Sequence, residues 1–185
     1  ETPLQAAPYP VAVGHAAAAQ GLAPQVVAPL YLQAFAAKKS LVVYMHSTAA
    51  SGGYYIAAPG RRIVANPGTI TGSIGVIGAF MNAEGFFKKL GITFDVAKSH
   101  DYADFTSQVK PVSEREKQFF ESFIATTYDQ FITHVAKGRA MTKEEVDAIA
   151  RGHVYGGADA KDINLIDAYG GLNDLQHFFI GTSFN

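Results

Sequence analysis

Apolar residues occur along this chain in two patterns, short continuous runs and longer stripes with helical spacing. Short apolar runs bounded by polar residues or by glycine and proline are typical of buried strands. Such runs predict strands at residues 11–13, 41–44, 63–65, 74–77 and 165–168. Residues 92–96 alternate apolar and polar side chains, which predicts a strand with one buried face.

Helical spacing of apolar residues, together with start and stop signals, predicts the helices. They are expected at residues 25–38, 52–58, 83–90, 113–138, 142–152 and 173–179. Ser113 with Glu116 and Thr142 with Glu145 each have the spacing of a capping box, which marks a helix start. Because strands alternate with helices, we expect an α/β fold, formed by one domain over residues 1–185.

Charge and composition exclude several classes of function. Lys and Arg total 15 against 16 Asp and Glu, so electrostatics give no reason to expect a nucleic-acid partner. The chain has no cysteine, which excludes a disulfide framework, a thiolate zinc site and a cysteine nucleophile. No apolar run is long enough to cross a bilayer, and residues 1–20 do not have the pattern of a signal peptide.

Ser51 is the residue whose surroundings most suggest chemistry. It follows a predicted strand and opens a predicted helix, with Gly52 and Gly53 directly after it. A serine at a helix N-terminus lies among unpaired backbone N–H groups, which can stabilise an alkoxide or a tetrahedral oxyanion. Serine is also a favoured N-cap residue. The pattern alone therefore leaves two readings of Ser51, a helix cap and a nucleophile.

Several segments resemble the signal peptide peptidase A family of serine peptidases, in the family's order and at compatible spacing. They are ASGGYYIA at residues 50–57, NPGTITGSIGV at 66–76, FITHVAKGR at 131–139, GHVYGG at 152–157 and GGL at 170–172. The resemblance covers about residues 39–175, and residues 1–38 are a diverged or shortened part. It implies a Clp protease/crotonase-like spiral of strand-strand-helix units and assembly into a ring.

The family's chemistry, carried onto matching positions, implies a Ser-Lys dyad. Ser51 is the implied nucleophile, and Ser73 lies where the family has a serine that hydrogen-bonds the lysine amine. Gly52, Gly53 and Gly72 are the implied oxyanion and substrate-binding positions. The lysine acts as a neutral general base, so burial has to lower its pKa. No cofactor or metal is implied.

The chain departs from the family pattern at two places. The position of the family's lysine is Ala103, in the stretch KSHDYAD at residues 98–104. Three explanations stay open: a variant made inactive, a base supplied by another subunit or half, and substitution by a nearby residue such as Lys98. The family's Pro-Gly-Gly segment before the serine is also absent, and Gly14 is the only glycine at a similar distance.

We therefore expect a bacterial peptidase that cleaves hydrophobic peptides such as signal-peptide remnants. Its expected location is the cell envelope, membrane-associated or periplasmic, and the apolar pair Phe86-Phe87 favours contacts between subunits. Two alternatives remain, a phage capsid-maturation protease of the same fold and a catalytically dead subunit that binds peptides or scaffolds a ring. Weaker candidates are a Ser51–His46 pair and a metal cluster of His100, Asp101 and Asp104.

Overall fold

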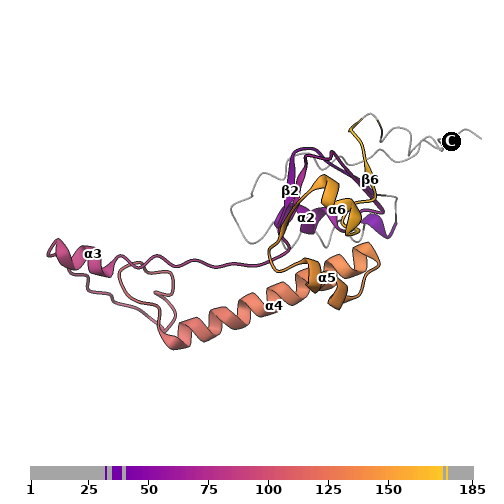
Figure 1. Cartoon of the computed structure of the whole chain (residues 1–185). Helices are drawn as coiled ribbons and strands as arrows, with labels where there is room; N and C mark the ends of the chain where they lie inside the picture. Colours follow the sequence, from indigo (N-terminus) through magenta and orange to yellow (C-terminus); the bar gives the residue numbers. More distant parts are fainter. Residues whose placement is uncertain (1–31, 33–34, 39–40, 173, 175–185) are drawn as a thin grey trace, which may run out of the picture. The chain divides into compact units, whose positions relative to one another are not determined.

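A computed structural model describes residues 32, 35–38, 41–172 and 174 of this 185-residue chain (Figure 1). The chain forms two compact units. Unit 1 consists of Glu1–Gly75 with Gln130–Asn185, and unit 2 consists of Val76–Asp129. Within the described part of the chain, no helix combines the length and apolar character needed to cross a membrane.

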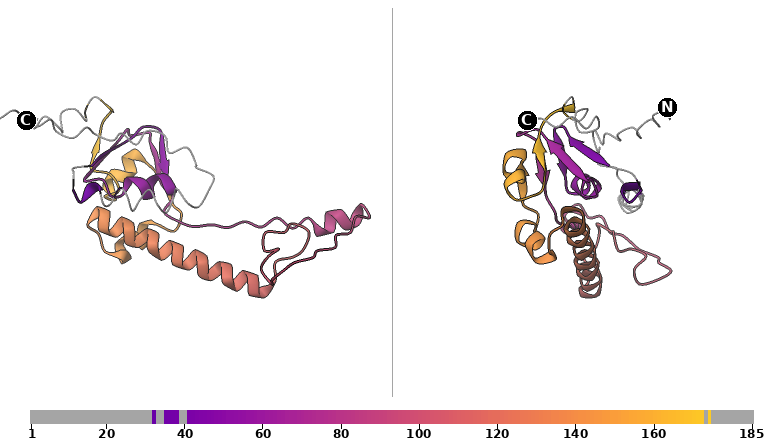
Figure 2. Two further views of the ribbon diagram at one scale, coloured as in Figure 1. Left: turned by 180° about the vertical axis from the view of Figure 1, so that it is seen from behind. Right: turned by 90° about the vertical axis from the view of Figure 1, so that its right-hand side faces the viewer.

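Unit 1 contains two three-stranded sheets, one parallel and one mixed. In one sheet β1 (Val42–Met45), β3 (Arg62–Ala65) and β6 (Ala168–Tyr169) lie parallel in that order. In the other sheet β2 (Thr48–Ala50) is parallel to β4 (Ile70–Gly72), which pairs antiparallel with β5 (Val154–Gly156). Figures 1 and 2 show these strands gathered together.

Helices complete unit 1. They are α2 (Gly52–Ala57), the part of α4 (Glu114–Arg139) from Gln130 onward, α5 (Lys143–Ile149) and α6 (Gly157–Asp162). Helix α2 contacts β2, and α6 contacts β4, β5 and β6 (Figure 2). Gly138 allows α4 to approach the end of α2 closely, because a Cβ at this position would collide with the carbonyl of Ala58.

The core of unit 1 is built from the strands and the helices packed on them. Its largest fully buried side chains include Val43, Met45, Ile63, Val64, Tyr54, Val135, Val146 and Leu165. Full burial of each large aliphatic side chain contributes about 1.5–3 kcal/mol. A partly buried ion pair joins the end of α4 to the residue before β6, since Arg139 donates to both carboxylate oxygens of Asp167 at 2.9 and 3.1 Å.

Unit 2 contains α3 (Glu84–Lys89) and the first part of α4, joined by long irregular segments. Its packing is largely aromatic. The Phe120 ring lies 4.7 Å from Phe80 and 5.9 Å from Phe105, measured between ring centroids. Gly78 has to be glycine, because a side chain there would occupy the space of the Phe120 ring.

Both capping boxes predicted from the sequence are present. At the start of α4 the Ser113 amide donates to Glu116 at 2.8 Å, and the Glu116 amide donates to the Ser113 hydroxyl at 3.3 Å. At the start of α5 the reciprocal pair joins Thr142 and Glu145. The predicted helices at 52–58, 83–90 and 113–138 are confirmed to within a residue or two as α2, α3 and α4.

Two predicted strands are wrong, and a third is displaced. Residues 74–77 do not form a strand because Gly72 and Ser73 have positive φ (74° and 47°), which ends the extended ladder at Gly72. Residues 92–96 are exposed on both sides and pair with no described strand, although their side chains alternate. The strand expected at 165–168 is β6, which begins at Ala168.

Other elements were missed or lie outside the described residues. The strands β2, β4 and β5 and the helix α6 are short, and their sequences carry little apolar pattern. The strand expected at 11–13, most of the helix at 25–38 and the helix at 173–179 fall on residues that the structure does not describe.

Candidate active site

Ser51 lies between β2 and α2, in a strand–turn–helix arrangement. The predicted position at a helix N-terminus is confirmed, with β2 as the strand directly before it. The Ser51 amide donates to the carbonyl of Gly72 at 2.9 Å. Its carbonyl accepts from the Tyr55 amide, also at 2.9 Å. The backbone of this exposed serine is therefore held on both sides.

The conformation of Ser51 argues against a simple helix cap. Its φ of 52° and ψ of −120° match the first central position of a type II′ turn, which glycine dominates. Its side chain makes no capping hydrogen bond. A strained backbone at a non-glycine residue costs about 1–3 kcal/mol, and such residues cluster at active sites. A serine on a sharp strand-to-helix turn is the arrangement that exposes a nucleophilic hydroxyl in other hydrolases.

Gly52 and Gly53 supply the first turn of α2. The first N–H groups of a helix have no intrahelical acceptor, so they are available to an oxygen that carries negative charge. Neither glycine carries a side chain, which leaves the space above these amides open to a substrate backbone.

Gly72 and Ser73 lie at the end of the neighbouring strand β4. The register pairs Ala50 with Gly72, so Ser51 and Ser73 leave two adjacent parallel strands at the same edge. At Gly72 a Cβ would come within 2.7 Å of the Tyr155 ring, and the positive φ also favours glycine. The Ser73 amide donates to the His153 carbonyl at 2.6 Å. The structure therefore brings Ser51, Gly72 and Ser73 together.

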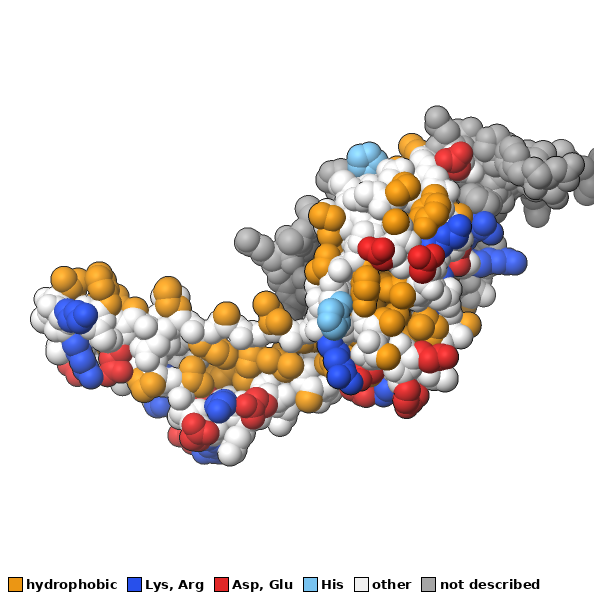
Figure 3. All heavy atoms as spheres, viewed as in Figure 1, with side chains coloured by type: hydrophobic (Ala, Val, Ile, Leu, Met, Phe, Trp, Pro, Cys, Tyr) orange, Lys and Arg blue, Asp and Glu red, His pale blue; other side chains and the backbone are white. Residues whose placement is uncertain are grey.

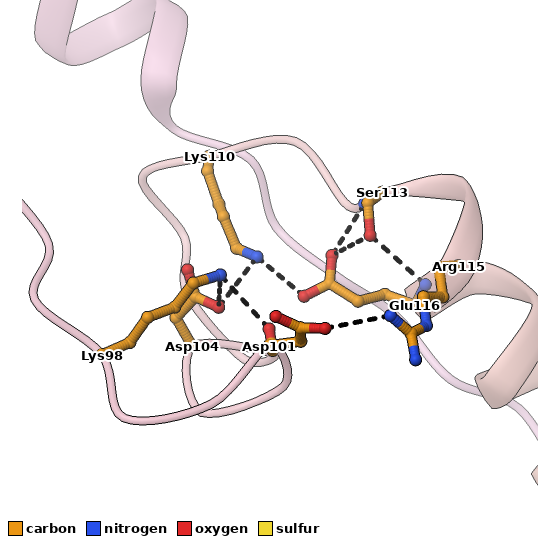
Figure 4. A network of polar contacts seen from close by, with 7 residues as sticks. All are labelled: Lys98, Asp101, Asp104, Lys110, Ser113, Arg115 and Glu116. Carbon is orange, nitrogen blue, oxygen red and sulfur yellow. Dashed lines mark hydrogen bonds and ion pairs between the residues drawn. The ribbon is translucent and has the colours of Figure 1, made fainter.

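Ala103 lies in unit 2, in a turn where its amide donates to the carbonyl of His100 at 3.1 Å. A network of charged side chains surrounds this turn (Figure 4). Its members are Lys98, Asp101, Asp104, Lys110, Ser113, Arg115 and Glu116. Asp104 accepts from both Lys98 and Lys110, each at 3.1 Å.

Lys98 and Lys110 are the lysines nearest to the family's lysine position in sequence, and both are engaged within this network. Lys98 also donates to the Asp101 carbonyl at 3.2 Å, and Lys110 donates to Glu116 at 2.7 Å. The bond to Glu116 raises the pKa of Lys110 despite some desolvation, which keeps that amine protonated. These contacts favour structural roles for both lysines over the role of general base.

The acidic members of the network also serve ion pairs. Asp101 binds Arg115 at 2.9 Å, and Asp104 binds the two lysines, so neither matches the sequence-based alternative of a metal cluster with His100. The hydrogen bonds from Lys110 and Ser113 lower the pKa of Glu116 from 4.5 to about 2. The network thus ties the loop at 98–110 to the first turn of α4.

Sequence reasoning missed two residues that support the Ser51 turn. Tyr54 is fully buried, and its hydroxyl donates to the Leu165 carbonyl at 2.8 Å. His134 reaches from α4 to the carbonyl of Tyr55 at 2.9 Å. A signal for the second contact exists in the sequence, because Pro59 lies four residues after Tyr55 and has no N–H to offer its carbonyl.

The fold and the site define an α/β protein with a serine on a strand-to-helix turn, a class that includes the Clp protease and crotonase type of fold. Residues 33–178 match Peptidase family S49, and the chain belongs to this family. The resemblance to signal peptide peptidase A is thereby confirmed at the level of the family.

Two curated relatives illustrate the match. The chain is 40% identical over 152 residues to Protease 4 of Salmonella typhi, covering 82% of this chain and 24% of that protein. It is 41% identical over 128 residues to the putative signal peptide peptidase SppA of Enterococcus faecium, covering 69% of this chain and 37% of that protein. The matched region thus spans only 24% and 37% of these relatives' lengths.

A solved structure supports the fold. The crystal structure of a peptidase from Plasmodium falciparum aligns with a TM-score of 0.51 at 9% sequence identity. The alignment covers 90% of this chain and 80% of that one. At this identity the likeness shows the fold alone.

Proposed function

We propose that this chain is the serine-bearing part of a peptidase that cleaves short hydrophobic peptides, such as remnants of signal sequences. Ser51 is its nucleophile. The observation that carries this proposal is the backbone of Ser51, which is strained, held at both its amide and its carbonyl, and not used for helix capping. Membership of Peptidase family S49 supports the same assignment.

The reaction follows from the groups around Ser51. The hydroxyl oxygen attacks the scissile carbonyl while its proton passes to a neutral lysine amine, which Ser73 orients. The N–H groups at Gly52 and Gly53 stabilise the oxyanion of the tetrahedral intermediate, together with the backbone at Gly72. When the intermediate collapses, the lysine returns the proton to the leaving amine and an acyl-enzyme remains. Water then attacks the ester, with the same amine as general base, and releases Ser51.

The lysine comes from outside this chain, from a second half or a neighbouring subunit. Ala103 cannot accept a proton, and Lys98 and Lys110 are bound to Asp104. Unit 2 also exposes large hydrophobic side chains, including Ile77, Phe86 and Phe94. Hydrophobic side chains are visible on its surface in Figure 3. Exposed apolar surface of this extent is typical of contacts with another subunit. A ring-shaped assembly at the cell envelope accounts both for a lysine from outside this chain and for the exposed apolar surface of unit 2.

A fluorophosphonate probe tests the nucleophile directly. We expect covalent labelling of Ser51 in the complete assembly, located by mass spectrometry, and no labelling in Ser51→Ala. The isolated chain should label far more slowly because it has no base. The competing candidate is a catalytically dead scaffold, which Ala103 favours. Absence of labelling in the complete assembly would establish the scaffold and reject the peptidase.

A further inference from the structure

Helix α2 contains a carbonyl that its own backbone cannot satisfy. In an α-helix the carbonyl of residue i accepts from the N–H of residue i+4. For Tyr54 this partner is Ala58, whose amide donates at 2.9 Å. For Tyr55 the partner would be Pro59, which has no N–H. A carbonyl left without a donor away from water is destabilising, so the sequence requires a donor from elsewhere.

His134 on α4 provides that donor. Its Nε2 lies 2.9 Å from the Tyr55 carbonyl oxygen. Because a carbonyl only accepts, Nε2 must carry the hydrogen. The imidazole also stacks on the Tyr55 ring, with centroids 4.4 Å apart, and Phe131 makes an edge contact with the same Tyr55 ring at 4.8 Å. His134 is buried, so one orientation of the ring is fixed by packing and by the hydrogen bond.

The two peptide groups of Tyr55 link this contact to Ser51. The Tyr55 carbonyl accepts from His134, and the Tyr55 amide donates to the Ser51 carbonyl at 2.9 Å. A strained conformation persists only where its surroundings over-determine it. The bond from Tyr55 is one of the two backbone bonds that hold Ser51 in its strained conformation, and His134 contacts Tyr55 at both its carbonyl and its ring.

We propose that His134 is a positioning residue for the nucleophile: by donating to the carbonyl that Pro59 leaves unpaired, it fixes Tyr55 and thereby the backbone of Ser51. This inference rests on the proposed role of Ser51. Burial lowers the pKa of His134, which keeps the imidazole neutral near neutral pH. Its Nε2–H is held on the Tyr55 carbonyl, so His134 acts on Ser51 through the backbone of α2.

Matched substitutions separate the contribution of the His134 hydrogen bond from that of side-chain packing. His134→Leu keeps a side chain of comparable bulk and removes the donor, whereas His134→Gln retains an N–H donor. Val146→Ala is the control, because Val146 is fully buried in a different helix, α5, where its truncation makes a cavity. All variants are made in the full-length protein with its assembly partner. The two readouts are amide exchange in peptides spanning α2, and the rate of fluorophosphonate labelling per folded molecule.

We expect His134→Leu to exchange the α2 amides about tenfold faster and to label about tenfold more slowly than the unmodified protein. His134→Gln should recover most of both effects. Val146→Ala should accelerate exchange across unit 1 and leave the labelling rate per folded molecule unchanged. If His134→Leu behaves like Val146→Ala, the positioning role is wrong.

The two proposals fail in different ways. An unmodified assembly that never labels would reject Ser51 as nucleophile. The exchange comparison would then still decide whether His134 holds Tyr55 and the turn at Ser51.

Discussion

The strain at Ser51 predicts that glycine stabilises the protein at this position while abolishing its activity. Two substitutions isolate the effect. Ser51→Ala removes the hydroxyl and keeps a Cβ in the unfavourable backbone conformation. Ser51→Gly removes both the hydroxyl and the Cβ that makes φ 52°, ψ −120° unfavourable.

The magnitudes follow from the local structure. Because the Ser51 side chain makes no capping hydrogen bond and is exposed, Ser51→Ala should change the free energy of unfolding by no more than about 0.5 kcal/mol. Relief of strain in Ser51→Gly contributes about 1–3 kcal/mol. The greater freedom of glycine in the unfolded chain offsets about 0.5–1 kcal/mol of this gain. The expected net stabilisation is therefore about 0–2.5 kcal/mol.

Urea unfolding at one fixed protein concentration measures the difference. For an m-value of about 2 kcal/mol/M, the midpoint of Ser51→Gly should lie up to roughly 1.2 M above that of Ser51→Ala, with equal m-values. Neither variant should react with a fluorophosphonate. If Ser51→Gly is less stable than Ser51→Ala, the backbone of Ser51 is not strained, and the main structural support for its role is lost.

Three further predictions follow. Ala103→Lys in the isolated chain should raise the rate of hydrolysis of a hydrophobic peptide ester by about 10²–10⁴-fold. The double variant with Ser51→Ala should show no hydrolysis. If Ala103→Lys is no faster than the unmodified chain, a lysine at this position cannot act as the base for Ser51. Sedimentation at micromolar concentration should show an oligomer, and a monomer would contradict the role of the exposed apolar surface of unit 2. The bonds from Lys110 and Ser113 depress the pKa of Glu116, so their stabilising contribution should be complete above about pH 4.5 and disappear as the pH falls toward about 2. Acid unfolding of Lys110→Met should show a weaker dependence across this range, and an unchanged dependence would place the acid-sensitive group elsewhere.

The sequence by itself determined the elements whose signals are local. A capping box needs only two side chains three residues apart, so Ser113 with Glu116 and Thr142 with Glu145 were sufficient to place two helix starts. The sequence also predicted the position of Ser51 ahead of a small-residue helix. The family, too, was predicted from ordered motifs and is confirmed.

Elements that depend on partners were not predictable in this way. Residues 92–96 alternate like a strand, but a strand also needs a neighbour, and none of the described strands pairs with them. Conversely, β4 has little apolar pattern and is a strand because β2 and β5 lie on its two sides. Its Thr71 is fully buried, which is tolerated because its hydroxyl donates to the Ala49 carbonyl at 2.9 Å.

Tertiary structure alone decided the character of the site. The residues that hold Ser51 are 4 and 21 positions away in sequence, Tyr55 and Gly72, and His134 reaches Tyr55 from 79 positions away. Pro59 showed in advance that a carbonyl would need a donor, but not which residue would provide it. The local sequence determines which backbone groups lack a helical partner. Only the packing of α4 against α2 brings the His134 imidazole to within hydrogen-bonding distance of the Tyr55 carbonyl.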